Sequence, residues 1–283
     1  MNNRFSALDK KKVIAKFPQR PRDSHKGQFG TVAVIGGAGG MIGAPFLAGR
    51  AALKLGAGSV HIGLLAENGP GVDMLQPELM LHSASAATKL HGVSVFAIGC
   101  GLGTSIAAQK LLYELLRREV VLVLDADALN LIARHNDLQN DLRNRKVATV
   151  LTPHPGEAAR LLACDKETIQ ADRVEAIRKI SQKFSSGVVL KGAESLCATR
   201  DGKLFVNRTG NPGMSSPGMG DVLTGMIAAF IAQGMAVDDA LLLATHLHGA
   251  AGDALAEQGI AIGMTATDVT EWARHLLNQW MIN

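Results

Sequence analysis

The sequence has few cysteines, few aromatic residues and no long run of uncharged apolar residues. Its three cysteines, Cys100, Cys164 and Cys197, lie far apart and lack zinc-type spacing. This argues against a disulfide framework and a structural metal, and we expect small core or loop residues there. No run of about 18 or more apolar residues indicates a membrane span, and the N-terminus lacks the apolar region of a signal peptide. We therefore expect a cytoplasmic protein with no membrane partner.

Positive charge is not concentrated in one stretch, although the formal net charge is +4. Lys and Arg residues are spread along the chain, so no basic stripe is present that would neutralise a nucleic-acid backbone. We expect no nucleic-acid partner. A single local cluster of basic residues is typical of a solvated N-terminal segment. It consists of Lys10, Lys11, Lys12, Lys16, Arg20 and Arg22.

Apolar residues and glycine are plentiful, with 47% hydrophobic residues and 31 glycines among 283 residues. Apolar runs of strand length alternate with amphipathic segments of helix length. The expected strands are 31–35, 59–65, 93–98, 120–124, 147–151 and 187–190, and the expected helices between them are 44–55, 104–118, 156–163 and 166–184. This alternation predicts an α/β enzyme with a mainly parallel sheet covered by helices on both faces.

The pattern changes after residue 191. Segments 195–199 and 203–207 flank an Arg-Asp-Gly turn and predict a hairpin. A glycine-rich loop follows at 209–220, and then three helical segments at about 221–233, 237–258 and 267–280. No linker divides the chain, so we expect an N-terminal extension, residues 1–25, and a single domain, residues 26–283.

The first glycine-rich motif is VAVIGGAGGMIGAP, residues 32–45, which follows an expected strand. Gly37, Gly40 and Gly43 have Gly-x-x-Gly-x-x-Gly spacing, a weak match to the dinucleotide fingerprint Gly-x-Gly-x-x-Gly. Glu67 lies past the next strand, near the place of the acidic residue that holds a ribose in such folds. Two interpretations stay open: a turn whose glycines only permit close packing, and a contact to a phosphate or nucleotide.

The second glycine-rich motif is GNPGMSSPGMGDVLTGMIAAF, residues 210–230. Its glycines free the backbone before a helix, so several N–H groups are able to point into one cavity and favour an anion. Asp221 stands at the helix start, where it is either a helix cap or a general base beside an anion hole.

Together these motifs resemble the ribokinase-like superfamily and, within it, the NAD(P)H-hydrate dehydratase family. The resemblance runs from about residue 27 to the last helix. It is carried in order by GGAGGMIGAPFLAGRAALKLGAGSV, GCGLG, DADALN, LTPHPGEAARLL, VVLKGAES, NRTGNPGM, GDVLTGMIAAFIAQG and HLHGAAGD. It implies a three-layer ribokinase-like α/β fold.

The resemblance also implies an activity, which is the ADP-dependent dehydration of the S form of hydrated NADH or NADPH. The hydrate hydroxyl is phosphorylated and phosphate is then expelled, giving NAD(P)H, AMP and phosphate. Mg²⁺ is the implied cofactor, a homotetramer the implied assembly, and the hydrate epimerase is expected on a separate polypeptide. Three alternatives stay open: a vitamin-type kinase of the same superfamily, an oxidoreductase that uses the first glycine motif, and a non-catalytic nucleotide-binding protein.

Roles carry over from the resemblance to individual positions. Asp221 is the implied catalytic base and contacts the hydrate, and with Gly218 and Gly220 it forms the anion hole. The other hydrate-lining residues are Ala44, Gly103 and His154. The nucleotide-binding residues are Lys191, Gly192, Ala193, Glu194, Ser195 and Gly220. Asn211 shapes the loop or holds the substrate, and no metal ligands are assigned.

The chain departs from the family pattern just before Asp221, where it reads SSPGMGD instead of the usual ATGGSGD. Pro217 lacks an amide hydrogen and Met219 replaces a hydroxyl with a thioether. The departure puts the number of anion-hole donors in question. Ser195 also stands where Thr is common, which keeps the hydroxyl.

Several other polar residues have two interpretations each. Asp125 and Asp127 end an expected strand and suit either a water-bridged Mg²⁺ or a helix cap. Lys191 either neutralises phosphate charge, which we favour, or closes a salt bridge. His246 and His248 are two residues apart on an expected helix and therefore do not form a metal pair, so we assign both to packing.

Overall fold

The structure is a computed structural model that describes residues 5–282. A ten-stranded sheet runs through it in the order β1-β10-β9-β8-β7-β6-β5-β2-β3-β4. The strands are β1 (Ser6–Ala7), β2 (Thr31–Gly36), β3 (Ser59–Leu64), β4 (Met80–Ser83), β5 (Val95–Ile98), β6 (Val121–Leu124), β7 (Thr149–Leu151), β8 (Gly187–Leu190), β9 (Leu196–Ala198) and β10 (Leu204–Val206). Strands β2 to β8 pair in parallel, whereas β9 is antiparallel to both β8 and β10.

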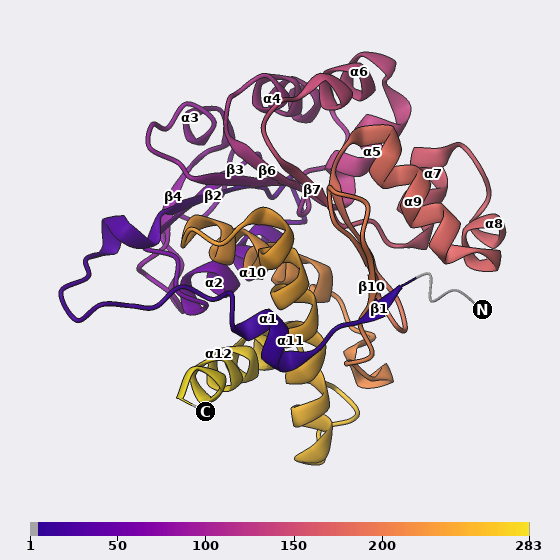
Figure 1. Cartoon of the computed structure of the whole chain (residues 1–283). Helices are drawn as coiled ribbons and strands as arrows, with labels where there is room; N and C mark the ends of the chain where they lie inside the picture. The colour runs from indigo at the N-terminus through magenta and orange to yellow at the C-terminus, as the bar shows by residue number, and fades with distance from the viewer. Residues whose placement is uncertain (1–4, 283) are drawn as a thin grey trace.

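Helices cover both faces of this sheet (Figure 1). One face carries α1 (Lys10–Ile14), α2 (Gly43–Lys54), α10 (Met219–Ala232), α11 (Val237–Glu257) and α12 (Ala266–Ile282). The other carries α3 (Ala84–Ala87), α4 (Ile106–Leu116), α5 (Ala126–Arg134), α6 (Asn136–Asn144), α7 (Pro155–Leu162), α8 (Lys166–Ala171) and α9 (Arg173–Phe184). The predicted three-layer, mainly parallel α/β fold is confirmed.

Strand β2 shows why the sheet is buried on both faces. Val32 and Val34 pack into the apolar core on the α10 side, and Ala33 and Ile35 pack into the core on the α4 side. All four are fully buried. Alternate side chains of a strand point to opposite faces, so a continuous apolar run requires a helix layer on each side.

Several local predictions differ from the structure. The expected helix 166–184 is two helices, because Asp172 leaves the helical conformation (φ −143°, ψ 80°) and its carboxylate accepts a hydrogen bond from Glu175 N that caps α9. Strand β4 was not predicted, because half of its four residues, His82 and Ser83, are polar. Helices α5 and α6 were also not predicted, and they fill the connection between β6 and β7.

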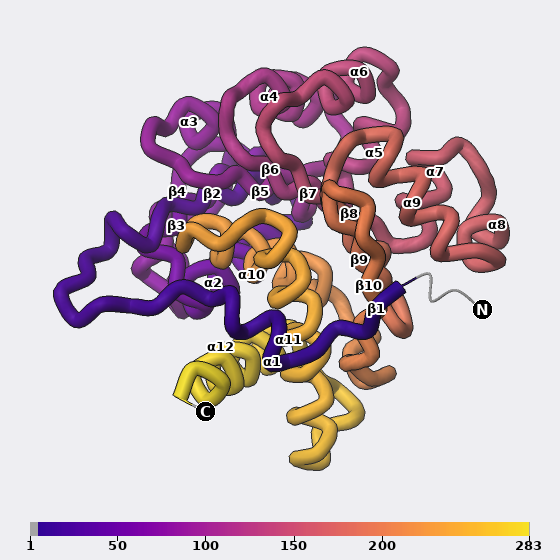
Figure 2. The backbone as a smooth tube through the Cα atoms, viewed as in Figure 1, coloured from indigo at the N-terminus to yellow at the C-terminus, as the bar shows by residue number. Residues whose placement is uncertain are grey.

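The N-terminal segment packs along the domain. The lysines of its basic cluster are exposed as expected, but Val13 and Phe17 of the same segment are buried. The Phe17 ring meets Phe230 of α10 edge-on at 5.5 Å between centroids, and Arg20 donates to Gly56 O at 2.6 Å. The segment, drawn in indigo, runs from β1 past α11 toward β2 (Figure 2). It is therefore not simply a solvated tail.

Candidate active site

The start of helix α10 faces the carboxyl edge of the sheet. Gly218 is the N-cap and has a left-handed backbone (φ 89°), which a residue with a side chain adopts only at a cost. The first four N–H groups of a helix have no intrahelical acceptor, and here they belong to Gly218, Met219, Gly220 and Asp221. All four lie after Pro217, so that proline removes none of the four helix-terminal donors. The altered sequence before Asp221 therefore leaves all four helix-terminal N–H groups in place.

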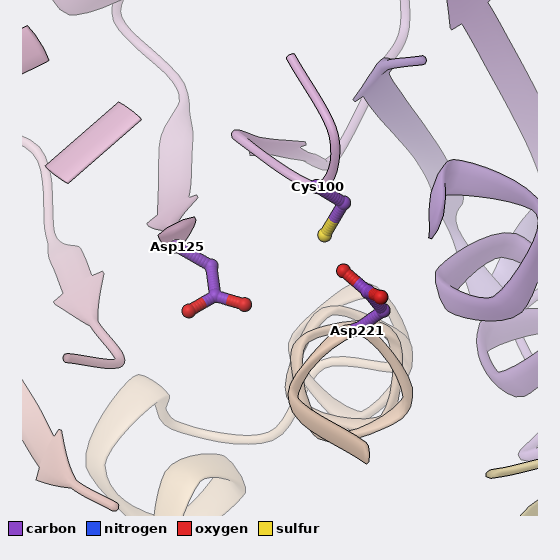
Figure 3. A group of neighbouring side chains, drawn as sticks. All are labelled: Cys100, Asp125 and Asp221. Atoms are coloured by element: carbon purple, nitrogen blue, oxygen red, sulfur yellow. The ribbon is translucent and has the colours of Figure 1, made fainter. Parts of the chain in front are cut away.

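Three side chains from different elements meet in front of this helix: Cys100 after β5, Asp125 after β6, and Asp221 in the first turn of α10 (Figure 3). Their sulfur and carboxylate atoms lie within 4.8 Å of one another. The Cys100 thiol donates a hydrogen bond to Asp221. The arrangement places two carboxylates and a thiol around one small space.

The carboxyl of Asp221 has a pKa well above its ordinary value. Burial and, to a smaller extent, the charge of Asp125 raise the pKa of its carboxyl to about 7, although the Cys100 hydrogen bond and the charge of Lys191 act to lower it. A base works best with a pKa near the working pH. Asp221 therefore combines a suitable pKa with a position among free helix amides.

Asp125 is held by three donors and is almost fully buried. The Lys191 ammonium lies 2.7 Å from Oδ1, the Thr152 hydroxyl 2.8 Å from Oδ1, and the Thr224 hydroxyl 3.1 Å from Oδ2. Although Asp125 occupies the N-cap position of α5, its side chain makes no capping hydrogen bond. The helix-cap interpretation is therefore wrong for Asp125, whose side chain instead anchors a cation.

Lys191 reaches from the end of β8 to the start of α10. Its Nζ lies 3.9 Å from Glu157 Oε2, and a Cβ at Gly220 would lie 3.1 Å from Nζ. Burial alone lowers the pKa of Lys191, but the charges of Asp125 and Glu157 outweigh burial and raise it. Lys191 is thus a salt-bridge partner and also a fixed positive charge beside the amides of α10.

His154 and Glu157 form a second polar pair at this edge. His154 Nδ1 accepts the Gly156 amide hydrogen at 2.9 Å and caps α7, so Nε2 carries the ring proton and faces Glu157 Oε1 at 3.2 Å. Burial raises the pKa of Glu157 to about 7 against the opposing effect of Lys191. The His154 side chain is half exposed, so it stays accessible to a ligand while capping the helix.

The two glycine-rich turns after β2 and β5 are joined by hydrogen bonds. Gly37 N donates to Cys100 O at 3.1 Å, and Ala38 N donates to Gly101 O at 2.7 Å. A Cβ at Gly101 would lie 3.1 Å from Ala44 Cβ, so Ala44 borders the same turn. Gly103 N donates to Asp127 Oδ2 at 2.8 Å. The first motif therefore serves close backbone packing, and two of its amides are already paired.

A pocket of about 560 Å³ opens on the other side of α10. Its walls include Gly192, Ala193, Glu194 and Ser195 after β8, the 207–215 loop, and Met219 and Gly220. In the loop, Asn211 accepts from Gly213 N and donates to Asp253, so it shapes the backbone. The structure brings the expected nucleotide-binding residues to one pocket beside Asp221.

The two helix histidines differ. His246 hydrogen-bonds Asn207 and packs against Trp280, as expected. His248 lines the 560 Å³ pocket, and its buried Nε2 has no hydrogen-bond partner among residues 5–282. Its assignment to packing stays a prediction. Burial lowers the pKa of His248 to about 4, which keeps it neutral.

A magnesium ion fits this site as a companion of bound phosphates. The described cluster offers two carboxylates and a thiol, whereas Mg²⁺ prefers six oxygen ligands and commonly binds one or two carboxylates together with substrate phosphates. The Lys191 ammonium already occupies Asp125 Oδ1. The residues present therefore supply part of an oxygen shell and leave the rest to phosphate and water.

Sequence reasoning missed two members of the site, Cys100 and Glu157. Cys100 was expected to be a small core or loop residue, and it is fully buried. It contacts Asp221, which lies more than a hundred positions away in the sequence. The available signal was its place in GCGLG directly after a strand, the position where ligands gather in parallel sheets.

The fold is a mainly parallel sheet between two helix layers, and the carboxylate of Asp221 lies in the first turn of a helix that begins after a glycine. These features define a ribokinase-like α/β enzyme. A sequence model of the family described as NAD(P)H-hydrate dehydratase matches residues 32–274. The chain belongs to the NAD(P)H-hydrate dehydratase family.

Individual relatives agree with this assignment. The chain is 44% identical over 267 residues to the ADP-dependent (S)-NAD(P)H-hydrate dehydratase of Neisseria meningitidis, a match covering 93% of this chain and 90% of that protein. It is 39% identical to the bifunctional NAD(P)H-hydrate repair enzyme of Escherichia coli, but there the match, over 92% of this chain, spans only 50% of the relative. The crystal structure of the Bacillus subtilis ADP/ATP-dependent NAD(P)H-hydrate dehydratase, co-crystallised with ATP/Mg²⁺, is similar with a TM-score of 0.86 and 26% identity, covering 99% of this chain and 100% of that one.

Within residues 5–282, no helix has both the length and the apolar character required to cross a membrane.

Proposed function

We propose that the protein dehydrates the S form of hydrated NADH or NADPH at the expense of ADP, giving NAD(P)H, AMP and phosphate. The observation that carries this proposal is the position of Asp221. This carboxylate has a pKa of about 7, stands among four free helix amides, and lies between a nucleotide-sized pocket and the paired glycine turns.

The 560 Å³ pocket is the proposed place of ADP. Residues 192–195 and Gly220 line it, and the N–H groups of Gly218 to Asp221 supply hydrogen bonds and a positive helix end for phosphate oxygens. Lys191, which is held against Asp125, adds a fixed cation next to Gly220. Its charge is thus in position before the nucleotide arrives, so little reorganisation accompanies binding.

The hydrate ring would lie on the opposite side of Asp221, against Ala44, Gly103 and His154. Asp221 takes the proton of the hydrate hydroxyl, whose oxygen attacks the terminal phosphorus of ADP, and AMP leaves. The helix amides stabilise the charge on the transferred phosphoryl group. Mg²⁺ bound with the donor phosphates would neutralise part of their charge.

The phosphorylated hydrate then loses phosphate. The lone pair of the ring nitrogen forms a double bond to the ring carbon as the carbon–oxygen bond breaks, and loss of a proton from the neighbouring carbon restores the dihydronicotinamide ring. Phosphate leaves more readily than hydroxide. A site built for phosphoryl transfer is therefore suited to catalyse a dehydration.

The wider setting is also part of the proposal. The chain spans about half the length of the bifunctional repair enzymes that it matches. A hydrate epimerase is the proposed functional partner. Met74 and Leu75 are 83% and 79% exposed, which supports burial in a homo-oligomer, expected to be a tetramer. We place the protein in the cytoplasm.

The test is an assay with hydrated NADH and either ADP or ATP. Recovery of the reduced-nicotinamide absorbance with one AMP formed per ADP consumed is expected, and Asp221→Asn should slow both by about 10²- to 10⁴-fold. A stable phosphorylated product without recovery of absorbance would instead identify a vitamin-type kinase.

A further inference from the structure

A second pocket, of about 620 Å³, lies at the carboxyl ends of β3 and β4 and has no role in the proposed reaction so far. Its walls come from the segment after β3, the start of α3, and the exposed face of α4. It is as large as the proposed nucleotide pocket. The catalytic cluster lies between the two pockets along the sheet edge, because the strand order runs from β8 through β6, β5 and β2 to β3 and β4.

The pocket shares a wall with the active site. Leu65 N and Ala66 N, which line or border the pocket, donate at 2.9 Å to the carbonyl oxygens of Gly36 and Gly37. Gly37 in turn donates to the carbonyl of Cys100, which contacts Asp221. Strands β5 and β4 are three places apart, which corresponds to roughly 14 Å. A dinucleotide, with two riboses and two phosphates between its rings, is able to bridge this span.

The lining combines apolar surface with unpaired charge. Leu64, Leu81 and Leu111 offer contacts for the faces of a planar base. Glu67 and Lys110 also line the pocket, and across residues 5–282 neither side chain has a hydrogen bond or ion pair. These two charges are therefore available to a ligand.

Glu67 occupies an informative position. Strand β2 ends in the glycine turn, β3 pairs with it in parallel, and Glu67 follows β3. In dinucleotide-binding α/β folds, a carboxylate after the strand next to the glycine turn holds the ribose hydroxyls of adenosine. Glu67 has the same position relative to the glycine turn after β2, although the glycine spacing differs and the proposed reaction takes place at Asp221.

We propose that the 620 Å³ pocket receives the adenosine half of the hydrated dinucleotide, and that Glu67 binds its ribose hydroxyls and gives the enzyme a preference for hydrated NADH over hydrated NADPH. This inference rests on the proposed function. The lining carries two carboxylates, Glu67 and Glu114, against one ammonium, Lys110. A ribose 2′-phosphate would therefore meet net negative charge, whereas a 2′-hydroxyl donates a hydrogen bond to Glu67.

The experiment measures kcat and KM with ADP for three substrates: hydrated NADH, hydrated NADPH, and hydrated reduced nicotinamide mononucleotide, which lacks adenosine. Glu67→Gln is expected to raise KM for hydrated NADH about tenfold, the loss typical of hydrogen bonds to a charged group, with kcat unchanged. The preference over hydrated NADPH should shrink by a similar factor. The rise should be confined to substrates that carry adenosine.

Ala107→Trp provides a second, steric test, because Ala107 is exposed on α4 and lines the pocket. It should raise KM for both dinucleotide hydrates and not for the mononucleotide hydrate. Glu119→Gln is the matched control. Glu119 is an exposed carboxylate just before β6, at the amino-terminal ends of the parallel strands and therefore away from the pocket. It should leave all three KM values unchanged.

Normal ADP-dependent turnover with unchanged KM for hydrated NADH in both Glu67→Gln and Ala107→Trp would overturn the inference and leave the proposed function standing. If the unaltered protein consumes no hydrate with ADP, both proposals fall.

Discussion

The Nζ atom of Lys191 lies 2.7 Å from Oδ1 of Asp125 and faces Gly220 at the start of α10. One cation thereby joins the ends of β8 and β6 to the helix that carries Asp221. The Asp125 side chain is 2% exposed and that of Lys191 is 19% exposed. Removing either residue would therefore leave the charge of the other buried without its partner. The same contact thus supports the fold and sets the charge next to the proposed phosphate site.

Lys191→Met should lower the free energy of unfolding by about 3 to 5 kcal/mol, because it leaves the carboxylate of Asp125 buried without its cation. The double variant Lys191→Met/Asp125→Asn should regain most of this stability but not the affinity for ADP. Denaturant unfolding and ADP titration measure the two effects. Equal stability of Lys191→Met and the unaltered protein would contradict the structural role.

The proposed base predicts a pH dependence. Asp221 must be ionised to accept a proton, and its pKa is about 7. The logarithm of kcat/KM should therefore rise with unit slope up to about pH 7 and then level off. Asp125→Asn should move this inflection to lower pH, because the charge of Asp125 is one cause of the raised pKa. A profile that is flat between about pH 5 and pH 8 would exclude Asp221 as the titrating base.

Asp221→Asn should reduce turnover by about 10²- to 10⁴-fold, as expected for loss of a general base, and should also change stability with pH. The pKa of Asp221 in the folded protein, about 7, is higher than its ordinary value of 3.8. Ionisation therefore destabilises the fold progressively between about pH 4 and pH 7. The gain in melting temperature on substitution should be larger at about pH 8 than at about pH 5. An equal effect at both pH values would show that Asp221 is not perturbed in this way.

Gly218→Ala should disrupt the anion site as well as the fold. Gly218 and Gly234 have similar left-handed backbones, with φ of 89° and 92°, but a Cβ at Gly218 would run into Leu47, whereas one at Gly234 meets nothing within 4 Å. Gly234→Ala is thus the control for backbone strain alone, worth about 1 to 2 kcal/mol. Gly218→Ala should lose more stability and most AMP formation. Similar losses for both variants would count against close packing at Gly218.

Phe17→Ala tests whether the N-terminal segment belongs to the folded unit. Phe17 is buried against Phe230, so its loss should cost about 3 to 5 kcal/mol of stability. Lys16→Ala, at an exposed neighbouring position, should change stability by less than about 0.5 kcal/mol. Thermal or denaturant unfolding compares them, and equal stabilities would mean that the segment only lies on the surface.

The parts of the fold that were predictable are those with a continuous apolar signal. Strand β2 is apolar at nearly every position because both of its faces are buried. This continuous apolar run can be recognised from the sequence without any tertiary information. Strand β4 contains the polar residues His82 and Ser83, so its sequence lacks this apolar signal. It forms a strand because it pairs with β3. The break at Asp172 depends on a single residue that leaves the helical conformation inside an otherwise helical pattern.

The residues of the candidate site also fall into a predictable group and an unpredictable group. Asp221 and the glycines before it are predictable because a helix start and its free amides are local features. Cys100 is not, since its contact with Asp221 requires the close approach of the turn after β5 to α10. The effect of Pro217 also depended on where α10 begins, and its first residue, Met219, lies after the proline.

In the proposed reaction the hydrate hydroxyl is phosphorylated by ADP and then leaves as phosphate. The most direct test uses hydrated NADH that carries a heavy oxygen isotope in this hydroxyl, followed by mass analysis of the products. The label is expected in the released phosphate and not in AMP or water. Label released into water, with unlabelled phosphate formed from ADP, would show that dehydration and nucleotide cleavage are separate events and would contradict the proposed mechanism.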